Sequence, residues 1–104
     1  MIKKYALWRV ILGIFLMGPH VVRAADLEAG KAFYAEKRCG MCHFLEGKGG
    51  KVASDLSGVG SRRDGEWLLK FLKDPKKVAD AKMMPVKGTE EELVNLVAYL
   101  LSHK

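Results

Sequence analysis

The sequence has few metal-ligating side chains and lacks a long apolar segment. Its 104 residues include two cysteines and three histidines, whereas a closed zinc site needs about four protein ligands. Of the histidines, His20 lies in the N-terminal segment and His103 lies at the C-terminus, where we expect the chain to fray. The apolar run from Val10 to Gly18 is too short to span a membrane. These shortages argue against a structural zinc protein and against stable membrane insertion.

After residue 24, no stretch of the sequence alternates regularly between apolar and polar residues, so we expect no substantial sheet. This argues against a thioredoxin-like redox protein, whose paired cysteines sit at the head of a helix in a strand-rich fold. We find no nucleophile paired with a base, no second metal site and no second domain that would form a pocket. We therefore predict that the chain alone is not an enzyme.

The first residues have the pattern of an export signal. Lys3 and Lys4 form a short basic start, the apolar run follows, and Ala24 ends a segment that a signal peptidase can read. We predict a cleaved secretory signal peptide over residues 1–24 and one domain over residues 25–104. Cleavage after Ala25 fits almost as well, and an uncleaved N-terminal anchor is the alternative interpretation.

Most of the positive charge belongs to this signal. The chain has 18 basic and 12 acidic residues, and four of the basic ones (Lys3, Lys4, Arg9 and Arg23) precede residue 25, so 14 remain and the formal charge falls from +6 to +2. The strong positive charge that would favour a nucleic-acid partner is therefore absent from the predicted domain. A domain of about 80 residues is marginally stable on its apolar core alone, so we expect a staple, metal or large cofactor to complete it.

Two helices are predicted before residue 75. Asp26 can cap a helix over about 27–38, with apolar side chains at helical spacing on one side. A second helix is predicted over 64–73, because Pro75 forces a stop near Asp74.

The last helix has the clearest pattern. Thr89 and Glu92 match a capping box, and the apolar residues that follow recur at i, i+3, i+4 and i+7 (Leu93, Leu96, Val97 and Leu100). The glycine-rich segment 46–60 and the segment 76–88 are predicted to be irregular.

The segment CGMCH, residues 39–43, holds both cysteines. Side chains three positions apart face the same side of a helical turn, and the histidine that follows can turn its ring toward whatever the sulfurs hold. The pattern C-x-x-C-H is typical of c-type haem attachment, with two thioethers to the vinyl groups and the histidine as an axial iron ligand. We predict haem attached to Cys39 and Cys42 with His43 on the iron. A structural disulfide is the main alternative.

The second axial ligand is expected in the segment Met83-Met84-Pro85. A methionine sulfur opposite His43 would give six-coordinate iron that does not readily bind small molecules, and it would raise the reduction potential relative to two histidines. Pro85 restricts the residue before it to extended conformations, which stiffens the loop. A loop methionine ordinarily fills a gap in the core. Sequence physics separates Met83 from Met84 only weakly, so both are candidates at this point.

Six segments, taken in order, resemble a small class I cytochrome c across the predicted domain: DLEAGKAFY, CGMCH, DLSGVGSR, EWLLKFLKDPKK, KMMP and TEEELVNLVAYL. The resemblance implies an all-α cytochrome c fold, with three main helices and loops wrapped around one covalently bound haem c. It implies iron held by His43 and Met84, because family members usually carry the ligand methionine directly before a proline. It also implies one-electron transfer as the function.

The resemblance also implies structural roles for several further residues. Gly30 would let the last helix cross the first closely, and Tyr34 would pack against Tyr99. Trp67 resembles an indole that can donate to a haem propionate, with an ordinary core aromatic as the alternative. Related sequences commonly have a Gly-Pro pair whose proline carbonyl accepts a hydrogen bond from the axial histidine. This chain has Ser54 in the proline position, and its carbonyl can take the same role.

The predicted function is a periplasmic electron carrier that meets redox protein donors and acceptors transiently and works as a monomer. An export signal together with haem attachment through thiols places the protein outside the cytoplasm. One alternative is a cytochrome subunit that works only inside a periplasmic oxidoreductase complex. Another is a haem-based sensor whose methionine dissociates so that a gas or peroxide binds. A haem-free thiol protein is the third.

Overall fold

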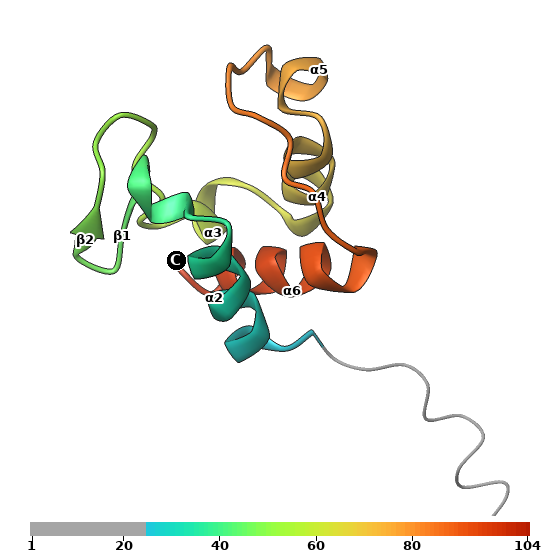
Figure 1. Ribbon diagram of the computed structural model, residues 1–104, viewed down its shortest axis with the longest axis horizontal. Helices are drawn as coiled ribbons and strands as arrows, with labels where there is room; N and C mark the ends of the chain where they lie inside the picture. Colours follow the sequence, from blue (N-terminus) through green and yellow to red (C-terminus); the bar gives the residue numbers. More distant parts are fainter. Residues whose placement is uncertain (1–24) are drawn as a thin grey trace, which may run out of the picture.

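The computed structural model describes residues 25–104 and is mostly helical (Figure 1). Its elements are α2 (Leu27–Glu36), the 3₁₀ turn η1 (Cys39–Met41), β1 (Phe44–Leu45), β2 (Lys48–Gly49), α3 (Val59–Arg62), α4 (Gly65–Lys73), α5 (Pro75–Ala79) and α6 (Glu90–Leu101). The expected export signal lies outside the described residues. Within the described part, no helix has the length and apolar character needed to cross a membrane.

The three longest helices begin close to their predicted starts, and a side chain caps each of them. The Asp26 carboxylate accepts from the amide of Ala29, and the Asp64 carboxylate accepts from the amide of Trp67. At α6, the capping box is complete because Thr89 and Glu92 each accept a hydrogen bond from the other's amide, at 3.1 and 2.8 Å. Helix α2 ends at Glu36, two residues before the predicted end, because Arg38 adopts a left-handed conformation (φ 57°) that turns the chain into η1.

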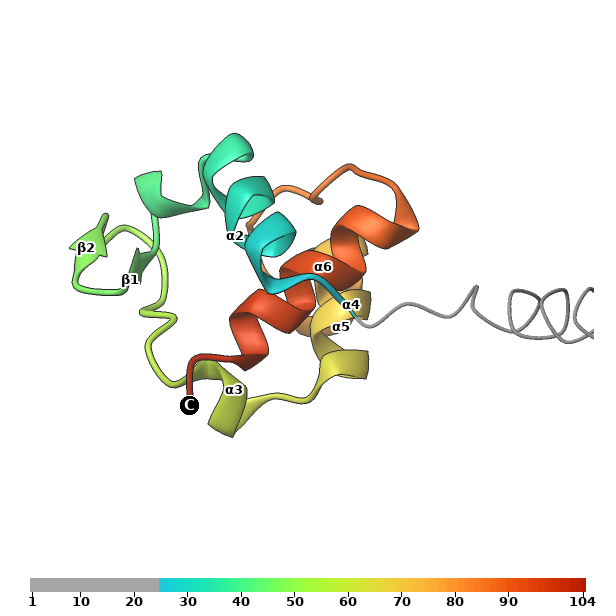
Figure 2. The same cartoon turned by 90° about the horizontal axis from the view of Figure 1, so that it is seen from below.

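Helices α2 and α6 cross closely, as Figure 2 shows. A Cβ at Gly30 would overlap the carbonyl oxygen of Asn95 and would lie 2.9 Å from the Cβ of Tyr99. Beside this crossing, the rings of Tyr34 and Tyr99 meet edge to face with centroids 5.5 Å apart. The expected roles of Gly30, Tyr34 and Tyr99 are therefore confirmed.

The core lies where α4 and the hairpin pack against the crossed helices. Leu96 of α6 has only 1% of its surface exposed, and Leu68 and Leu72 of α4 belong to the same buried cluster. The hairpin of β1 and β2 is antiparallel, and its register pairs Leu45 with Lys48. Leu45 is 4% exposed and joins the same core. With two strands of two residues each, the described sheet is as small as expected.

Three expectations are wrong. The segment 46–60 is not wholly irregular, because it contains β2 and the first residues of α3. The segment 76–88 is not wholly irregular, because Pro75 occupies the first turn of α5 and the Asp74 carboxylate caps it through the amide of Lys77. His103 is not at a frayed end either. Its carbonyl accepts from the amide of Gly60 at 2.8 Å, and its side chain is only 15% exposed. Contacts with residues far away in the sequence therefore hold the C-terminal residues in place.

Candidate functional site

Cys39 begins the turn η1, and Cys42 directly follows it as its C-cap. After Arg38, the amides of Cys42 and His43 donate to the carbonyl of Cys39, which closes the turn. Both thiols are free; Cys39 is half-buried and Cys42 is exposed. Burial raises the pKa of the Cys39 thiol. The turn therefore carries two unpaired thiols immediately before the histidine.

The segment 49–54 packs its backbone against this turn. The amide of Gly50 donates to the carbonyl of Gly40, and the amide of Ala53 donates to the carbonyl of Cys42, both at 2.9 Å. A Cβ at Gly50 would overlap the carbonyl oxygen of Met41 and would lie 3.1 Å from the Cα of Cys42. Only glycine allows so close an approach at this position. The motif is therefore held by main-chain contacts and not by the cysteines alone.

Ser54 ends that segment and fixes the imidazole of His43. The ring Nδ1 lies 2.7 Å from the carbonyl oxygen of Ser54. Because a carbonyl can only accept, Nδ1 carries the proton and donates, which leaves Nε2 as the free lone-pair nitrogen. Histidine ligands of metals are commonly oriented in this way. The expectation that the Ser54 carbonyl replaces the usual proline carbonyl is confirmed.

The two methionines of the 81–89 segment differ in their surroundings. Met83 is half-buried and packs against the core, whereas Met84 is 80% exposed. The amide of Val86 donates to the carbonyl of Leu72 at 2.8 Å, which fastens the segment to α4. Figure 1 shows this segment, in orange, and η1, in green, rising on opposite sides above the α2 and α6 pair.

Trp67 is half-buried between two side chains. The guanidinium of Arg63 lies 4.0 Å from its ring centroid, and Phe71 stacks on it at 4.9 Å. Tyr34 lies against Gly40, and its buried hydroxyl has no hydrogen-bond partner among the described residues. Burial raises the pKa of Tyr34 to about 12. The hydroxyl therefore stays neutral at physiological pH.

The donor set fits a covalently attached haem. It offers two free thiols in one turn and an imidazole whose Nε2 is available. Two apolar side chains on the flanking segments are exposed to solvent, since Val52 is 87% exposed and Met84 is 80% exposed. Within residues 25–104, no group of three or more His, Cys, Asp or Glu side chains could hold another metal.

Sequence reasoning missed two features of the site. It interpreted the glycines at 49 and 50 only as loop residues, although their clustering shortly after C-x-x-C-H was a usable signal for close backbone approach. It also missed the contact of His103 with Glu46, which no local pattern reveals because 57 positions separate the two.

Comparisons with known proteins agree with this geometry. A family model described as "Cytochrome c" matches residues 27–104. The X-ray structure of ferric cytochrome c-550 from Paracoccus versutus is similar to this chain, with a TM-score of 0.57 and 19% identity over 77% of this chain and 98% of that one. At this identity the likeness shows the fold. No curated protein matches the chain.

Proposed function

Because the chain belongs to the cytochrome c family, and is therefore a haem c protein of electron transport, we propose that Cys39 and Cys42 attach one haem and that His43 binds its iron. The observation that carries this proposal is the hydrogen bond from His43 Nδ1 to the Ser54 carbonyl. That bond selects the tautomer in which Nε2 can donate its lone pair to a metal. The bound haem would supply a one-electron couple between ferric and ferrous iron.

We further propose Met84 as the second axial ligand. Its side chain is open, whereas Met83 is already engaged with the core and would have to leave it to bind iron. The anchored Val86 amide and the restriction that Pro85 imposes limit the movement of the loop. Two protein ligands would fill both axial positions, which favours electron transfer over binding of a gas or peroxide.

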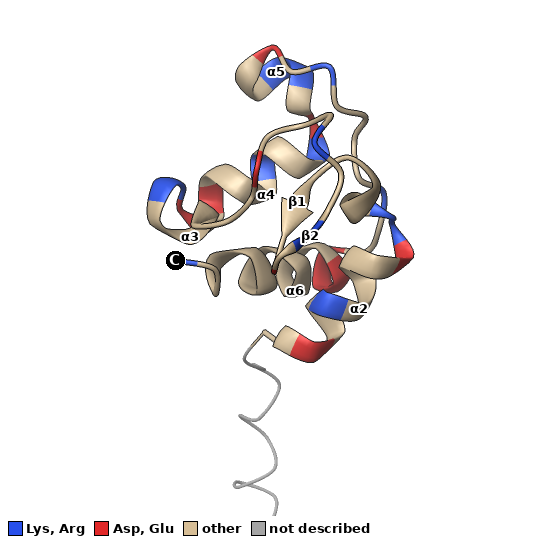
Figure 3. Ribbon diagram, turned by 90° about the vertical axis from the view of Figure 1, so that its left-hand side faces the viewer, with Lys and Arg blue, Asp and Glu red and all other residues tan. Residues whose placement is uncertain are grey.

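The rest of the chain would hold this geometry through the redox cycle and leave part of the site accessible to partners. Figure 3 shows Lys and Arg spread over α2, α3, α4 and α5 with acidic residues between them. Such a mixed surface suits brief encounters with redox proteins, which use small interfaces. We propose an exported, periplasmic monomer in which the chain alone has no catalytic role.

The test is the absorption spectrum of the purified ferric protein, made in a host that attaches haem c. Methionine bound to ferric haem gives a weak band at the red end of the visible spectrum, and we expect this band in the unaltered protein. Met84→Ala should abolish the band, and the matched control Met83→Ala should keep it. The opposite pattern would assign the ligand to Met83. If the unaltered protein lacks the band and its ferrous form takes up carbon monoxide, the sensor alternative replaces the electron carrier.

A further inference from the structure

One side chain holds the loop that follows the Ser54 carbonyl, the group that orients His43. Arg62 donates from Nη2 to the carbonyl oxygen of Asp55 at 2.9 Å and from Nη1 to the carbonyl oxygen of Ser57 at 2.7 Å. The planar guanidinium presents its donors as a rigid fork, so the two carbonyls are held in one geometry. The Asp55 carboxylate accepts from the Ser57 amide at 2.8 Å and adds a turn within the loop. We call the two bonds from the guanidinium the Arg62 clamp.

The clamp lies directly beside the carbonyl that His43 uses. The peptide planes that carry the Ser54 and Asp55 carbonyls meet at the Cα of Asp55, so only two soft dihedrals separate them. When Arg62 holds the second plane, rotation of the first plane is limited as well. On the other side of Ser54, the amide of Ala53 donates to a carbonyl of the C-x-x-C-H turn at 2.9 Å. Arg62 is therefore placed to set the direction of the carbonyl oxygen that accepts from His43.

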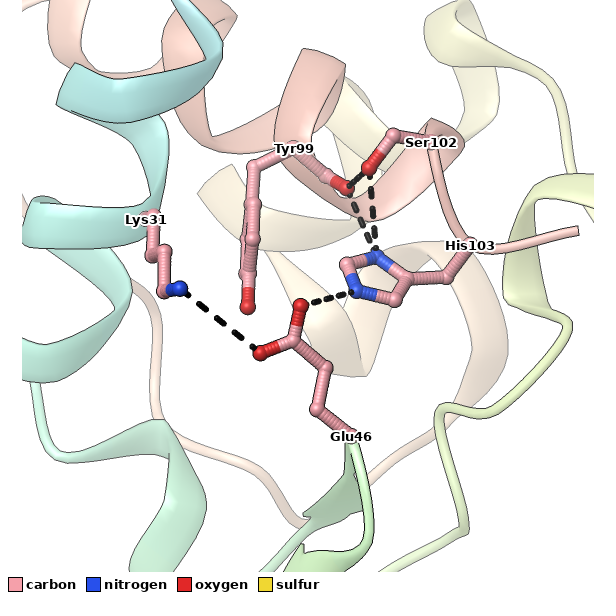
Figure 4. Close-up of polar contacts among 5 residues, drawn as sticks. All are labelled: Lys31, Glu46, Tyr99, Ser102 and His103. Atoms are coloured by element: carbon pink, nitrogen blue, oxygen red, sulfur yellow. Dashed lines mark hydrogen bonds and ion pairs between the residues drawn. The ribbon is translucent and has the colours of Figure 1, made fainter.

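Arg62 acts from a fixed base. It is the last residue of α3, whose first residue, Val59, is 5% exposed and belongs to the core. The amide of Gly60, also in α3, donates to the carbonyl of His103 at 2.8 Å. The ring of His103 is held in turn, 2.8 Å from a carbonyl of α6 and 3.1 Å from the Glu46 carboxylate (Figure 4). The clamp therefore fastens the loop to the end of α6.

The residue at position 54 makes such a restraint valuable. Related sequences commonly have proline there, whose ring fixes φ at about −65°. Serine leaves this dihedral free, and among the described residues no backbone hydrogen bond comes from the Ser54 amide. The loop therefore lacks a restraint at the residue whose carbonyl orients His43. The guanidinium of Arg62 supplies from a neighbouring helix the rigidity that a proline ring would supply within the backbone.

We propose that Arg62 is a positioning residue for the axial histidine: it holds the Ser54 carbonyl where His43 Nδ1 donates to it, and so sets how strongly His43 donates to the haem iron. The inference rests on the proposed function, since it requires iron on Nε2 of His43. A firm acceptor at Nδ1 raises the basicity of the imidazole, and a more basic ligand favours ferric iron. Release of the clamp should therefore raise the reduction potential. Loss of a nearby positive charge would lower it, so the two effects have opposite signs.

The test compares Arg62→Lys with Arg63→Lys in the haem-loaded ferrous protein. Lysine keeps the charge but lacks the planar fork. Arg63 is the matched control, because its guanidinium lies over the Trp67 ring, 4.0 Å from the centroid. The readout is hydrogen exchange of the His43 Nδ1 proton, followed by nuclear magnetic resonance. We expect exchange about tenfold faster in Arg62→Lys, as for the loss of one hydrogen bond to a charged group, and an unchanged rate in Arg63→Lys.

A redox titration and a proline rescue give two further readouts. Arg62→Lys should raise the reduction potential, and Arg63→Lys should leave it in place. In a Ser54→Pro background the ring restrains the loop by itself, so adding Arg62→Lys should change neither the exchange rate nor the potential. If Arg62→Lys alone fails to attach haem, the double variant decides: it should attach haem and exchange the Nδ1 proton at the rate of the unaltered protein.

Several outcomes would overturn the inference and leave the electron carrier intact. One is an unchanged Nδ1 exchange rate in Arg62→Lys, and another is an equal change in both lysine variants. A change that persists in the Ser54→Pro background is a third, because Arg62 would then act by a route other than the loop. The proposed function fails in a different way: if the ring protons of His43 show no shift from a neighbouring haem in the unaltered protein, the histidine is not on the iron, and the inference falls with it.

Discussion

Substitution of Gly50 by alanine should strongly destabilise the packing around the C-x-x-C-H turn. The added Cβ would overlap the Met41 carbonyl oxygen and would lie 2.9 Å from its carbon. These are backbone atoms, so no side chain can rotate away. Overpacking of this kind costs about 1–3 kcal/mol, and the rigid neighbours favour the upper half of that range. In a domain of this size each kcal/mol lowers the melting temperature by about 4–8 °C.

Two other glycines provide matched controls. A Cβ at Gly40, inside the motif, would meet only Tyr34 Cε1 at an ordinary 3.8 Å, so Gly40→Ala should leave stability unchanged or raise it by up to about 1 kcal/mol. Gly47 has φ 76° and open space around it, so Gly47→Ala should cost only the left-handed strain, about 1–2 kcal/mol.

Thermal unfolding of the three haem-loaded variants, followed by circular dichroism, checks this order, and the haem-to-protein ratio reports attachment. We expect Gly40→Ala to be the most stable variant, Gly47→Ala intermediate, and Gly50→Ala the least stable with the lowest haem content. If Gly50→Ala unfolds at the same temperature as Gly40→Ala, the segment 49–54 does not pack against the turn as described.

Two further predictions concern the helix crossing and the loss of stability at acid pH. Gly30→Ala should lower the free energy of unfolding in urea by about 2–3 kcal/mol, because its Cβ would overlap the Asn95 carbonyl; an unchanged urea midpoint would contradict the close crossing. The hydrogen bond from the Ser57 amide lowers the pKa of Asp55, so this carboxylate contributes stability above its unfolded pKa of about 3.9 that is lost as pH falls. Asp55→Asn should therefore flatten the decline of stability below about pH 4, in urea titrations across pH, and an equally steep decline would refute this role.

Local chemistry allowed the three longest helices to be predicted, whereas the short helix α3 was missed. The predicted caps at Asp26 and Thr89 and the apolar spacing of the last helix are short-range signals, and the structure shows both cap bonds and a further one at Asp64. The same approach failed at Pro75. A proline ends the preceding helix, but it is also well suited to the first turn of the next one, and only the Asp74 cap shows that both occur.

Contacts between distant segments could not be predicted from periodicity. The fixing of His103 depends on Gly60 and Glu46, which approach it only after α6 has packed. The choice between Met83 and Met84 likewise depends on which side chain the core takes up, and the structure places Met83 there. The Ser54 carbonyl was an expectation from family resemblance alone, because a main-chain acceptor leaves no signature in residue type.

The most direct test of the central claim is the intact mass of the purified mature chain after denaturation, from a host that attaches haem c. We predict a chain that begins at Ala25 or Asp26 and retains one haem through Cys39 and Cys42, with the haem lost when both cysteines are replaced by alanine. A colourless protein with the mass of the polypeptide alone, produced alongside a haem-loaded control cytochrome, would contradict the account.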